Sequence, residues 1–305
     1  MSNSTFSSRR DFLARSAAWG AGAALAATCL PATGSEPSEE PTWQIGCFTR
    51  PFSRFEFAES LDGIAEAGFD YVGLMSIRLP AGSVGLHALS EEQAREVGEM
   101  VQQRGLKTLS NYYSGPPVAE SLEDGIAATK KLIDNCQTAG CRSILMGGTG
   151  REELYEDYYR AIAECCDYAA ERGVSIALKP HGGLNATGPQ CRKAVELVDH
   201  ENFSIWYDPG NIFFYSDGEL DPVEDAPTVA GLVTGMCVKD YRHPREVALN
   251  PGDGQVDFPR LVRRLRAGGF TSGPVVLETL EAGDLPATIA NARRARQFLE
   301  GILNG

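Results

Sequence analysis

The most informative stretch of the chain is Val174-Ser175-Ile176-Ala177-Leu178-Lys179-Pro180-His181-Gly182-Gly183. Its first five residues form a short apolar run, which is typical of a buried strand in a parallel sheet. The run ends in a charged residue, and three later apolar runs do the same, at Asp208, at Lys239-Asp240 and at Glu278. Charged side chains at the carboxyl ends of short buried strands are typical of a TIM-barrel active site.

Strand-like and helix-like segments alternate along the chain from Trp43 onward. Glycine follows five of the helical segments directly, which is the residue expected just past the end of a helix. These glycines are Gly68, Gly105, Gly140, Gly173 and the pair Gly268-Gly269. The expected strands are Trp43–Cys47, Tyr71–Met75, Leu106–Asn111, Cys141–Met146, Val174–Lys179, Phe203–Asp208, Val233–Lys239 and Val275–Glu278. The expected helices are Phe55–Ala67, Glu91–Arg104, Leu122–Ala139, Glu152–Arg172, Pro189–Val198, Pro222–Ala230, Phe258–Ala267 and Leu285–Leu303.

This alternation predicts an α/β protein with a single (β/α)8 TIM barrel over residues 43–305 and no second domain. A doubly wound sheet is the alternative fold. That fold would call for a glycine-rich phosphate fingerprint after the first strand, whereas the chain has Cys47-Phe48-Thr49-Arg50-Pro51 there. The barrel is therefore the favoured interpretation. Residues 35–42 are rich in Ser, Glu and Pro and are expected to form a solvated linker.

The composition of the 305 residues is that of an ordinary globular protein, with 43% hydrophobic residues. The formal net charge of −13 argues against nucleic acid as a partner. Seven of the eight cysteines lie beyond Cys29, and none shows the C-x-x-C spacing of a zinc ribbon. We expect most of them to be small buried apolar residues.

Residues 1–34 resemble a twin-arginine export signal. Arg9 and Arg10 precede Phe12-Leu13 and a mild apolar stretch at 17–30, which is too short to span a bilayer. An amphipathic helix is the alternative. The resemblance predicts recognition by the twin-arginine machinery, cleavage after Gly34 or Ala26, and a periplasmic or otherwise extracytoplasmic protein. The sequence around Cys29 is a poor match to a lipoprotein site, so we do not expect a lipid anchor.

Several motifs from Trp43 to the C-terminus resemble the xylose isomerase-like TIM-barrel superfamily, which includes sugar phosphate isomerases and epimerases. The motifs are Glu66–Gly73, Trp206–Asn211, Val238–Asp240, Gly252–Phe258 and Val275–Glu278. The resemblance covers the whole chain after the export signal. It implies a TIM barrel that acts on a carbohydrate.

The resemblance also implies a metal site, since members of that superfamily usually hold one divalent cation through Glu, Asp, His and Glu at four strand ends. Asp208 and Glu278 match two of these positions, whereas Lys179 and Cys237 occupy the other two. Mn, Zn, Mg or Co at Asp208 and Glu278 is the metal hypothesis, with Cys237 as a further candidate ligand. A charged lysine in such a site would repel the cation.

Lys179 has several candidate roles at a strand end. A desolvated lysine can act as a general base or form a Schiff base, and a protonated one can stabilise an enolate in place of a metal. A structural ion pair with Asp208 or Glu278 is the alternative. His181 follows by two residues and points the same way if the strand continues, so it is a candidate proton carrier, or else an ordinary loop histidine.

The predicted function is a sugar or keto-sugar isomerase or epimerase that transfers a proton next to a carbonyl group. Glu278 is the expected base, and Lys179 and His181 are expected to stabilise or reprotonate the enediolate. A lyase or dehydratase that uses Lys179, and a non-catalytic sugar-binding barrel without the metal, are the alternatives. The expected substrate contacts are Asn111, Asn211, Lys239, Asp240 and Arg242. Arg50, Arg78 and Arg242 are candidates for binding an anionic group, and the identity of the sugar and the oligomeric state stay open.

Overall fold

The computed structural model describes residues 43–79 and 82–305. The predicted export signal at 1–34, the linker at 35–42 and Cys29 lie outside these residues. Among the residues described, no helix is both long and apolar enough to cross a membrane.

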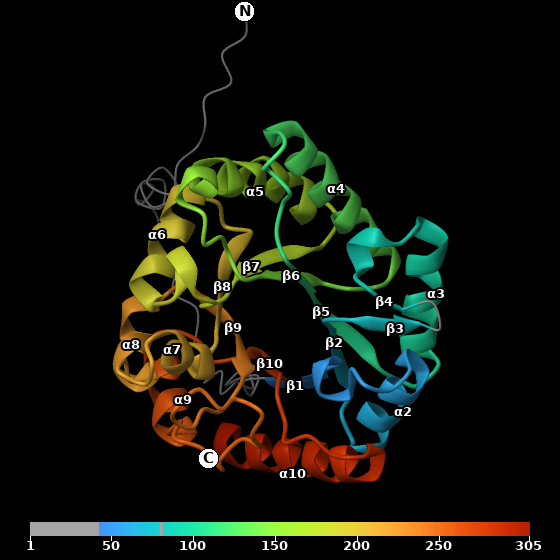
Figure 1. Ribbon diagram of the computed structural model, residues 1–305, viewed down its shortest axis with the longest axis vertical. Helices are drawn as coiled ribbons and strands as arrows, with labels where there is room; N and C mark the ends of the chain where they lie inside the picture. Colours follow the sequence, from blue (N-terminus) through green and yellow to red (C-terminus); the bar gives the residue numbers. More distant parts are fainter. Residues whose placement is uncertain (1–42, 80–81) are drawn as a thin grey trace, which may run out of the picture. The chain divides into compact units, whose positions relative to one another are not determined.

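Eight parallel strands close into a barrel in the order β1-β10-β9-β8-β7-β6-β5-β2, with helices around the outside (Figure 1). The barrel predicted from the sequence is therefore confirmed. The strands are β1 (Trp43–Phe48), β2 (Tyr71–Leu74), β5 (Lys107–Tyr113), β6 (Ser143–Met146), β7 (Ser175–Leu178), β8 (Phe203–Tyr207), β9 (Val233–Val238) and β10 (Gly273–Leu277).

Long helices cover the outer face of the barrel, each within a few residues of its expected bounds. They are α2 (Phe57–Glu66), α3 (Glu91–Gln102), α4 (Leu122–Thr138), α5 (Tyr155–Ala170), α6 (Gly188–Val198), α9 (Phe258–Ala267) and α10 (Leu285–Leu303). The glycines Gly68, Gly105, Gly140, Gly173 and Gly269 have φ between 66° and 101°, as expected for left-handed residues past helix ends.

Two parts of the fold were not predicted. A small antiparallel hairpin, β3 (Ile77–Leu79) and β4 (Gly82–Val84), follows β2. A short helix α7 (Pro209–Tyr215) begins directly after Asp208 and precedes the expected short helix, which is α8 (Pro222–Asp225). Asp208 accepts a hydrogen bond from the backbone N–H of Asn211, and Pro209 occupies the first turn, so an Asp-Pro pair starts this helix.

Strand alternation divides the buried side chains into two layers. The outer layer packs between the strands and the helices. The inner core fills the barrel and consists of Phe48, Leu109, Leu145, Ala177, Trp206, Cys237 and Val276. The seven cysteines of the described residues are all buried and unpaired, which confirms the expectation that they serve as apolar side chains.

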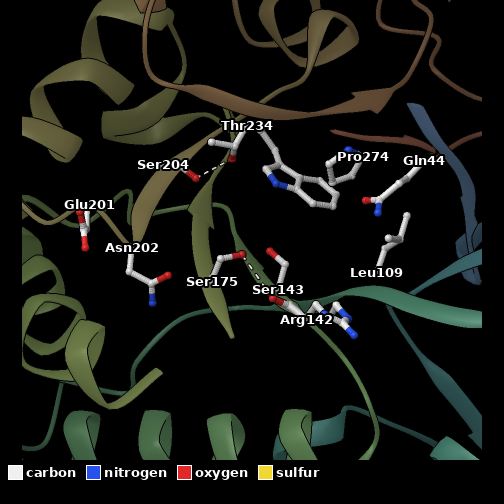
Figure 2. A pocket seen from close by; sticks show the side chains of 11 residues that line it. Gln44, Leu109, Arg142, Ser143, Ser175, Glu201, Asn202, Ser204, Thr234 and Pro274 are labelled. Atoms are coloured by element: carbon white, nitrogen blue, oxygen red, sulfur yellow. Dashed lines mark hydrogen bonds between the residues drawn. The ribbon is translucent and has the colours of Figure 1, made fainter. Parts of the chain in front are cut away.

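The end of the barrel where the strands begin contains a cavity of about 220 Å³ (Figure 2). The hydroxyls of Ser143, Ser175, Ser204 and Thr234 line it beside the indole of Trp206. Most of its side chains come from strand starts or the residues just before them, and none of the predicted site residues is among them. The predicted site residues lie at the opposite end, where the strands finish.

Candidate active site

Four charged side chains converge at the carboxyl ends of β7 to β10. Each lies two residues beyond a member of the inner core, so strand alternation points all four into the barrel mouth. We call them the ion cluster: Lys179, Asp208, Lys239 and Glu278. Lys179 Nζ lies 3.0 Å from Asp208 Oδ2 and 2.5 Å from Glu278 Oε2. Lys239 Nζ lies 3.2 Å from Asp208 Oδ2 and 2.8 Å from Glu278 Oε1.

The ion cluster is almost completely shielded from solvent. The side chains of Lys179, Asp208 and Glu278 are 0% exposed, and that of Lys239 is 3% exposed. A fifth charge, Arg50, donates from Nη1 to Glu278 Oε1 at 2.6 Å and is 44% exposed. Buried ions are tolerated only when they are paired and hydrogen-bonded, as these are. Three cations face two carboxylates, which gives the group a formal net charge of +1.

The close pairing fixes the protonation of Lys179 and Glu278. Burial alone would lower the pKa of Lys179, but Glu278 and Asp208 outweigh it and raise that pKa well above its usual value. Burial would likewise raise the pKa of Glu278, but Lys179, Lys239 and Arg50 hold it well below its usual value. Lys179 is therefore an ammonium and Glu278 a carboxylate at any pH near neutrality.

Three rings surround the ion cluster on the solvent side, and we call them the aromatic layer: Tyr112, His181 and Tyr215. The ring of His181 lies 6.0 Å from that of Tyr112 and 5.6 Å from that of Tyr215. Lys179 Nζ lies 5.6 Å from the centre of the Tyr112 ring. All three rings are partly exposed, so a molecule entering the barrel mouth meets them before it meets the cluster.

His181 is held as a neutral imidazole. Burial and the positive charges of Lys179 and Lys239 lower its pKa to about 4. Its backbone N–H donates to Asn185 O at 2.9 Å, and the ring fits only because residue 147 is glycine, where a Cβ would lie 2.8 Å from His181 Cγ. No other described residue forms a hydrogen bond with its ring nitrogens. A neutral, unpaired imidazole at an opening can accept a proton.

Comparison with known proteins gives the family. Residues 61–302 match the family model described as xylose isomerase-like TIM barrel. The chain belongs to the xylose isomerase-like TIM-barrel family. No curated protein matches it significantly.

Several solved structures share the fold of this chain at low sequence identity. A D-psicose 3-epimerase determined in the presence of D-fructose superposes with a TM-score of 0.69 at 13% identity, covering 86% of this chain and all of that one. An L-ribulose 3-epimerase gives 0.67 at 17% identity, covering 86% and 95%. A xylose isomerase domain protein from Planctomyces limnophilus gives 0.66 at 20% identity, covering 86% and 98%.

This member of the xylose isomerase-like family has a three-residue group with the spacing of a metal site. Ligand atoms of Asp208, Cys237 and Glu278 all lie within 4.8 Å of one another. The Lys179 ammonium, however, donates to both carboxylates. Burial also raises the pKa of the Cys237 thiol well above its usual value, which opposes formation of the thiolate. These residues do not fit a divalent cation while Lys179 is in place.

Two predicted substrate contacts instead support the site. Asn211 donates from Nδ2 to Pro180 O at 2.7 Å and accepts from Lys239 Nζ at 2.9 Å, so it links the ion cluster to the segment that carries His181. The buried carboxylate of Asp240 accepts backbone N–H groups. Its four donors are those of Tyr241, Gly252, Gly254 and Val256, at 2.8–3.1 Å. Asp240 therefore holds a loop and has no oxygen left for substrate.

Two other predicted contacts lie away from the cluster. Asn111 pairs in register with Leu74 and Ile144, which both belong to the outer layer, so its side chain faces away from the barrel interior. A register shift between β2 and β5 sets this direction, and Tyr112 faces inward in its place. Arg242 is 49% exposed and bonds to Glu246 and to Asp253 O at the rim.

The prediction of Glu278 as the base does not agree with its surroundings. Its carboxylate is buried and is shared by three cations, so it does not face the opening as a free acceptor for a substrate proton. The sequence interpretation named Arg50 only as a candidate for binding an anionic group and missed its pairing with Glu278. The signal was available, because Arg50 lies two residues beyond the inner-core residue Phe48 and so points into the same mouth.

Proposed function

We propose that this protein is a sugar or keto-sugar isomerase or epimerase that moves a proton next to a carbonyl group without using a divalent metal. The observation that carries the proposal is a neutral, unpaired His181 close to the buried ion cluster, which together with Arg50 has a formal net charge of +1. Membership of the xylose isomerase-like family and the fold shared with two sugar epimerases support the substrate class.

His181 is the proposed general base. Its ring accepts the proton from the carbon next to the substrate carbonyl, and negative charge develops on the carbonyl oxygen. Arg50 and the hydroxyls of Tyr112 and Tyr215 are the groups at the opening that stabilise this charge by hydrogen bonds. Burial raises the pKa of both tyrosines, so their hydroxyls stay protonated and can donate. Delivery of a proton to the opposite face of the same carbon epimerises the sugar, and delivery to the neighbouring carbon isomerises it.

The ion cluster has a supporting role in this mechanism. In this proposal its buried members do not contact the substrate, because the aromatic layer and the partly exposed Arg50 lie at the opening. Glu278 positions the Arg50 guanidinium through the 2.6 Å contact, and Lys179 fixes Glu278. The fixed charges also favour the developing enediolate over the neutral ketose, since they need no reorganisation during the reaction.

Two other functions share this site. A Schiff base at Lys179 requires a free amine lone pair, which the raised pKa and the two carboxylates oppose. Elimination from the same enediolate would make the protein a dehydratase and would use His181 in the same way. A non-catalytic sugar-binding barrel is favoured by one observation, namely that the ion cluster satisfies its own charges.

Solvent deuterium exchange separates these functions. The purified protein is incubated in D2O with D-fructose, D-psicose, L-ribulose and their acidic and phosphorylated counterparts, and the sugars are examined by NMR. An isomerase or epimerase introduces deuterium next to the carbonyl, and a dehydratase releases a deoxy-keto product. A sugar that binds without exchange would identify a binding protein and contradict the proposal.

His181→Gln tests the assignment of the base. Loss of a general base typically lowers the rate by about 10²–10⁴-fold, so the variant should lose nearly all exchange. His200→Gln is the matched control, because His200 lies just before the start of β8, where it pairs with Asp167 on the far side of the barrel. Full exchange by His181→Gln would show that another group takes the proton.

A further inference from the structure

A second feature of the barrel mouth is a cavity of about 220 Å³ beside Glu278. Its lining combines two arginines, two residues with hydroxyl groups, the Glu278 side chain that Arg50 pairs with, and a small apolar wall. The residues that carry the argument are Arg50, Arg54, Ser53, Thr279, Val247 and Leu280. They come from the segments that follow β1 and β10 and from the loop that follows β9, so the cavity opens at the same end of the barrel as the aromatic layer.

Both arginines retain donors for a ligand. Arg50 uses Nη1 on Glu278, and its Nε and Nη2 form no hydrogen bond with any described residue. Arg54 uses Nη1 on Gly283 O at 2.5 Å, and no acidic side chain pairs with it in the part of the chain described here. Guanidinium groups with open donors are well suited to planar or tetrahedral oxyanions.

Thr279 is an independent sign of a ligand. Thr279 is only 6% exposed, and its Oγ1 atom is buried with no hydrogen-bond partner among the described residues. A buried hydroxyl without a partner is unfavourable, and a bound water, ion or ligand group would satisfy it. Thr279 and both arginines line the same cavity.

We infer that this cavity binds the anionic oxyacid group of the substrate, a carboxylate or a phosphate, so that the site acts on acidic sugars in preference to neutral ones. The inference rests on the proposed function in placing the reacting carbonyl beside His181. The local balance of charge supports it: three cations against two carboxylates in and around the cluster, with Arg54 as a fourth cation. The overall charge of −13 opposes anions only weakly, since distant surface charges are screened.

The test compares three small matched ligands: glycerol, D-glycerate and glycerol 3-phosphate. Their binding to the full protein is followed by NMR shifts of the Ser53, Arg54 and Thr279 amides. At least one of the two anions should bind at least ten times more tightly than glycerol, and the tighter one identifies the carboxylate or the phosphate. Its affinity should fall as salt is added, because part of the attraction is between charges.

Two variants test the site itself. Arg54→Ala should weaken binding of the preferred anion about tenfold, the usual effect of losing one hydrogen bond to a charged group, and leave glycerol unchanged. Thr279→Val keeps the side-chain shape and should weaken the same anion several-fold. Arg151→Ala is the control, because Arg151 is an exposed arginine at the same end of the barrel that pairs with Glu153 and lines no part of the cavity.

The inference is overturned if glycerol binds as tightly as both anions, or if Arg54→Ala and Thr279→Val leave anion binding unchanged. Failure of the proposed function has a different signature, because the anion would still bind while none of the sugars exchanges deuterium. Exchange into D-fructose with no preference for the acidic or phosphorylated ketose would keep the proposed function and remove the anion subsite.

Discussion

His181 lies in an environment that lowers its pKa far below the usual value of a histidine. Its pKa in the folded protein is about 4, whereas an unfolded histidine titrates near 6.5. The folded state therefore binds fewer protons than the unfolded state between these values. The contribution of this residue to stability is complete above pH 6.5 and is lost as the pH falls toward 4. The full contribution is on the order of 3 kcal/mol.

We expect the free energy of unfolding to fall more steeply for the wild type than for His181→Gln over pH 6.5 to 4. Urea unfolding at several pH values measures both slopes. The comparison isolates His181, because the many carboxylates that titrate in the same range are common to both proteins. A difference between the two proteins that stays constant with pH would show that His181 is not held neutral.

Between β9 and α9, the loop at residues 250–256 depends on one buried carboxylate. Asp240 accepts the backbone N–H groups of Gly252, Gly254 and Val256 from this loop. Asp240→Ala should release these amides, at a cost of about 1–3 kcal/mol for each buried donor left unpaired. Hydrogen exchange measured by NMR should show faster exchange of the three amides.

The control for this prediction is Asp217→Ala, because Asp217 is an exposed aspartate near the same end of the barrel that pairs only with Arg245 among the described residues. It should leave the loop amides protected. Equal protection in Asp240→Ala would mean that the loop is held by its other contacts and that Asp240 is free to serve elsewhere.

Elements of secondary structure were predictable from the sequence wherever the signal was local. Apolar runs and terminal glycines gave the eight strands and the long helices, because burial and left-handed caps depend on neighbouring residues. The direction of Asn111 was not predictable, since a register shift between β2 and β5 decides it. The role of Asp240 was hidden for a similar reason, because its partners lie 12–16 residues later in a loop that folds back over it.

The site was predictable in its membership and not in its chemistry. Strand ends identified Lys179, Asp208, Lys239 and Glu278, because parallel strands bring their carboxyl ends together. Packing across the whole barrel decides which charged side chains pair with one another and how deeply they are buried. That packing turned Glu278 from an expected base into a buried anion, and it left His181 as the group able to take a proton.

Across the barrel as a whole, the charges of Asp208 and Glu278 are balanced by the Lys179 ammonium in place of the metal cation that the family resemblance implies. Lys179 occupies the position between Asp208 and Glu278, and a divalent metal would have to displace or deprotonate an ammonium whose pKa is raised. A ligand that binds only the folded state stabilises it, so metal binding would raise the melting temperature. We therefore expect neither EDTA nor about 1 mM Mn²⁺ to change the melting temperature of the wild type.

The double variant Lys179→Glu/Cys237→His should bind the metal and is therefore compared with the wild type. The two changes give the site the Glu, Asp, His and Glu ligands implied by the family resemblance, and they remove the ammonium that repels the cation. With a micromolar dissociation constant, about 1 mM Mn²⁺ would stabilise this variant by about 4 kcal/mol, which corresponds to roughly 10 °C for a domain of this size. Thermal unfolding with and without Mn²⁺, and elemental analysis after dialysis, measure the effect in both proteins. One bound metal per wild-type chain would show that Lys179 moves aside, and the mechanism would then have to include the metal.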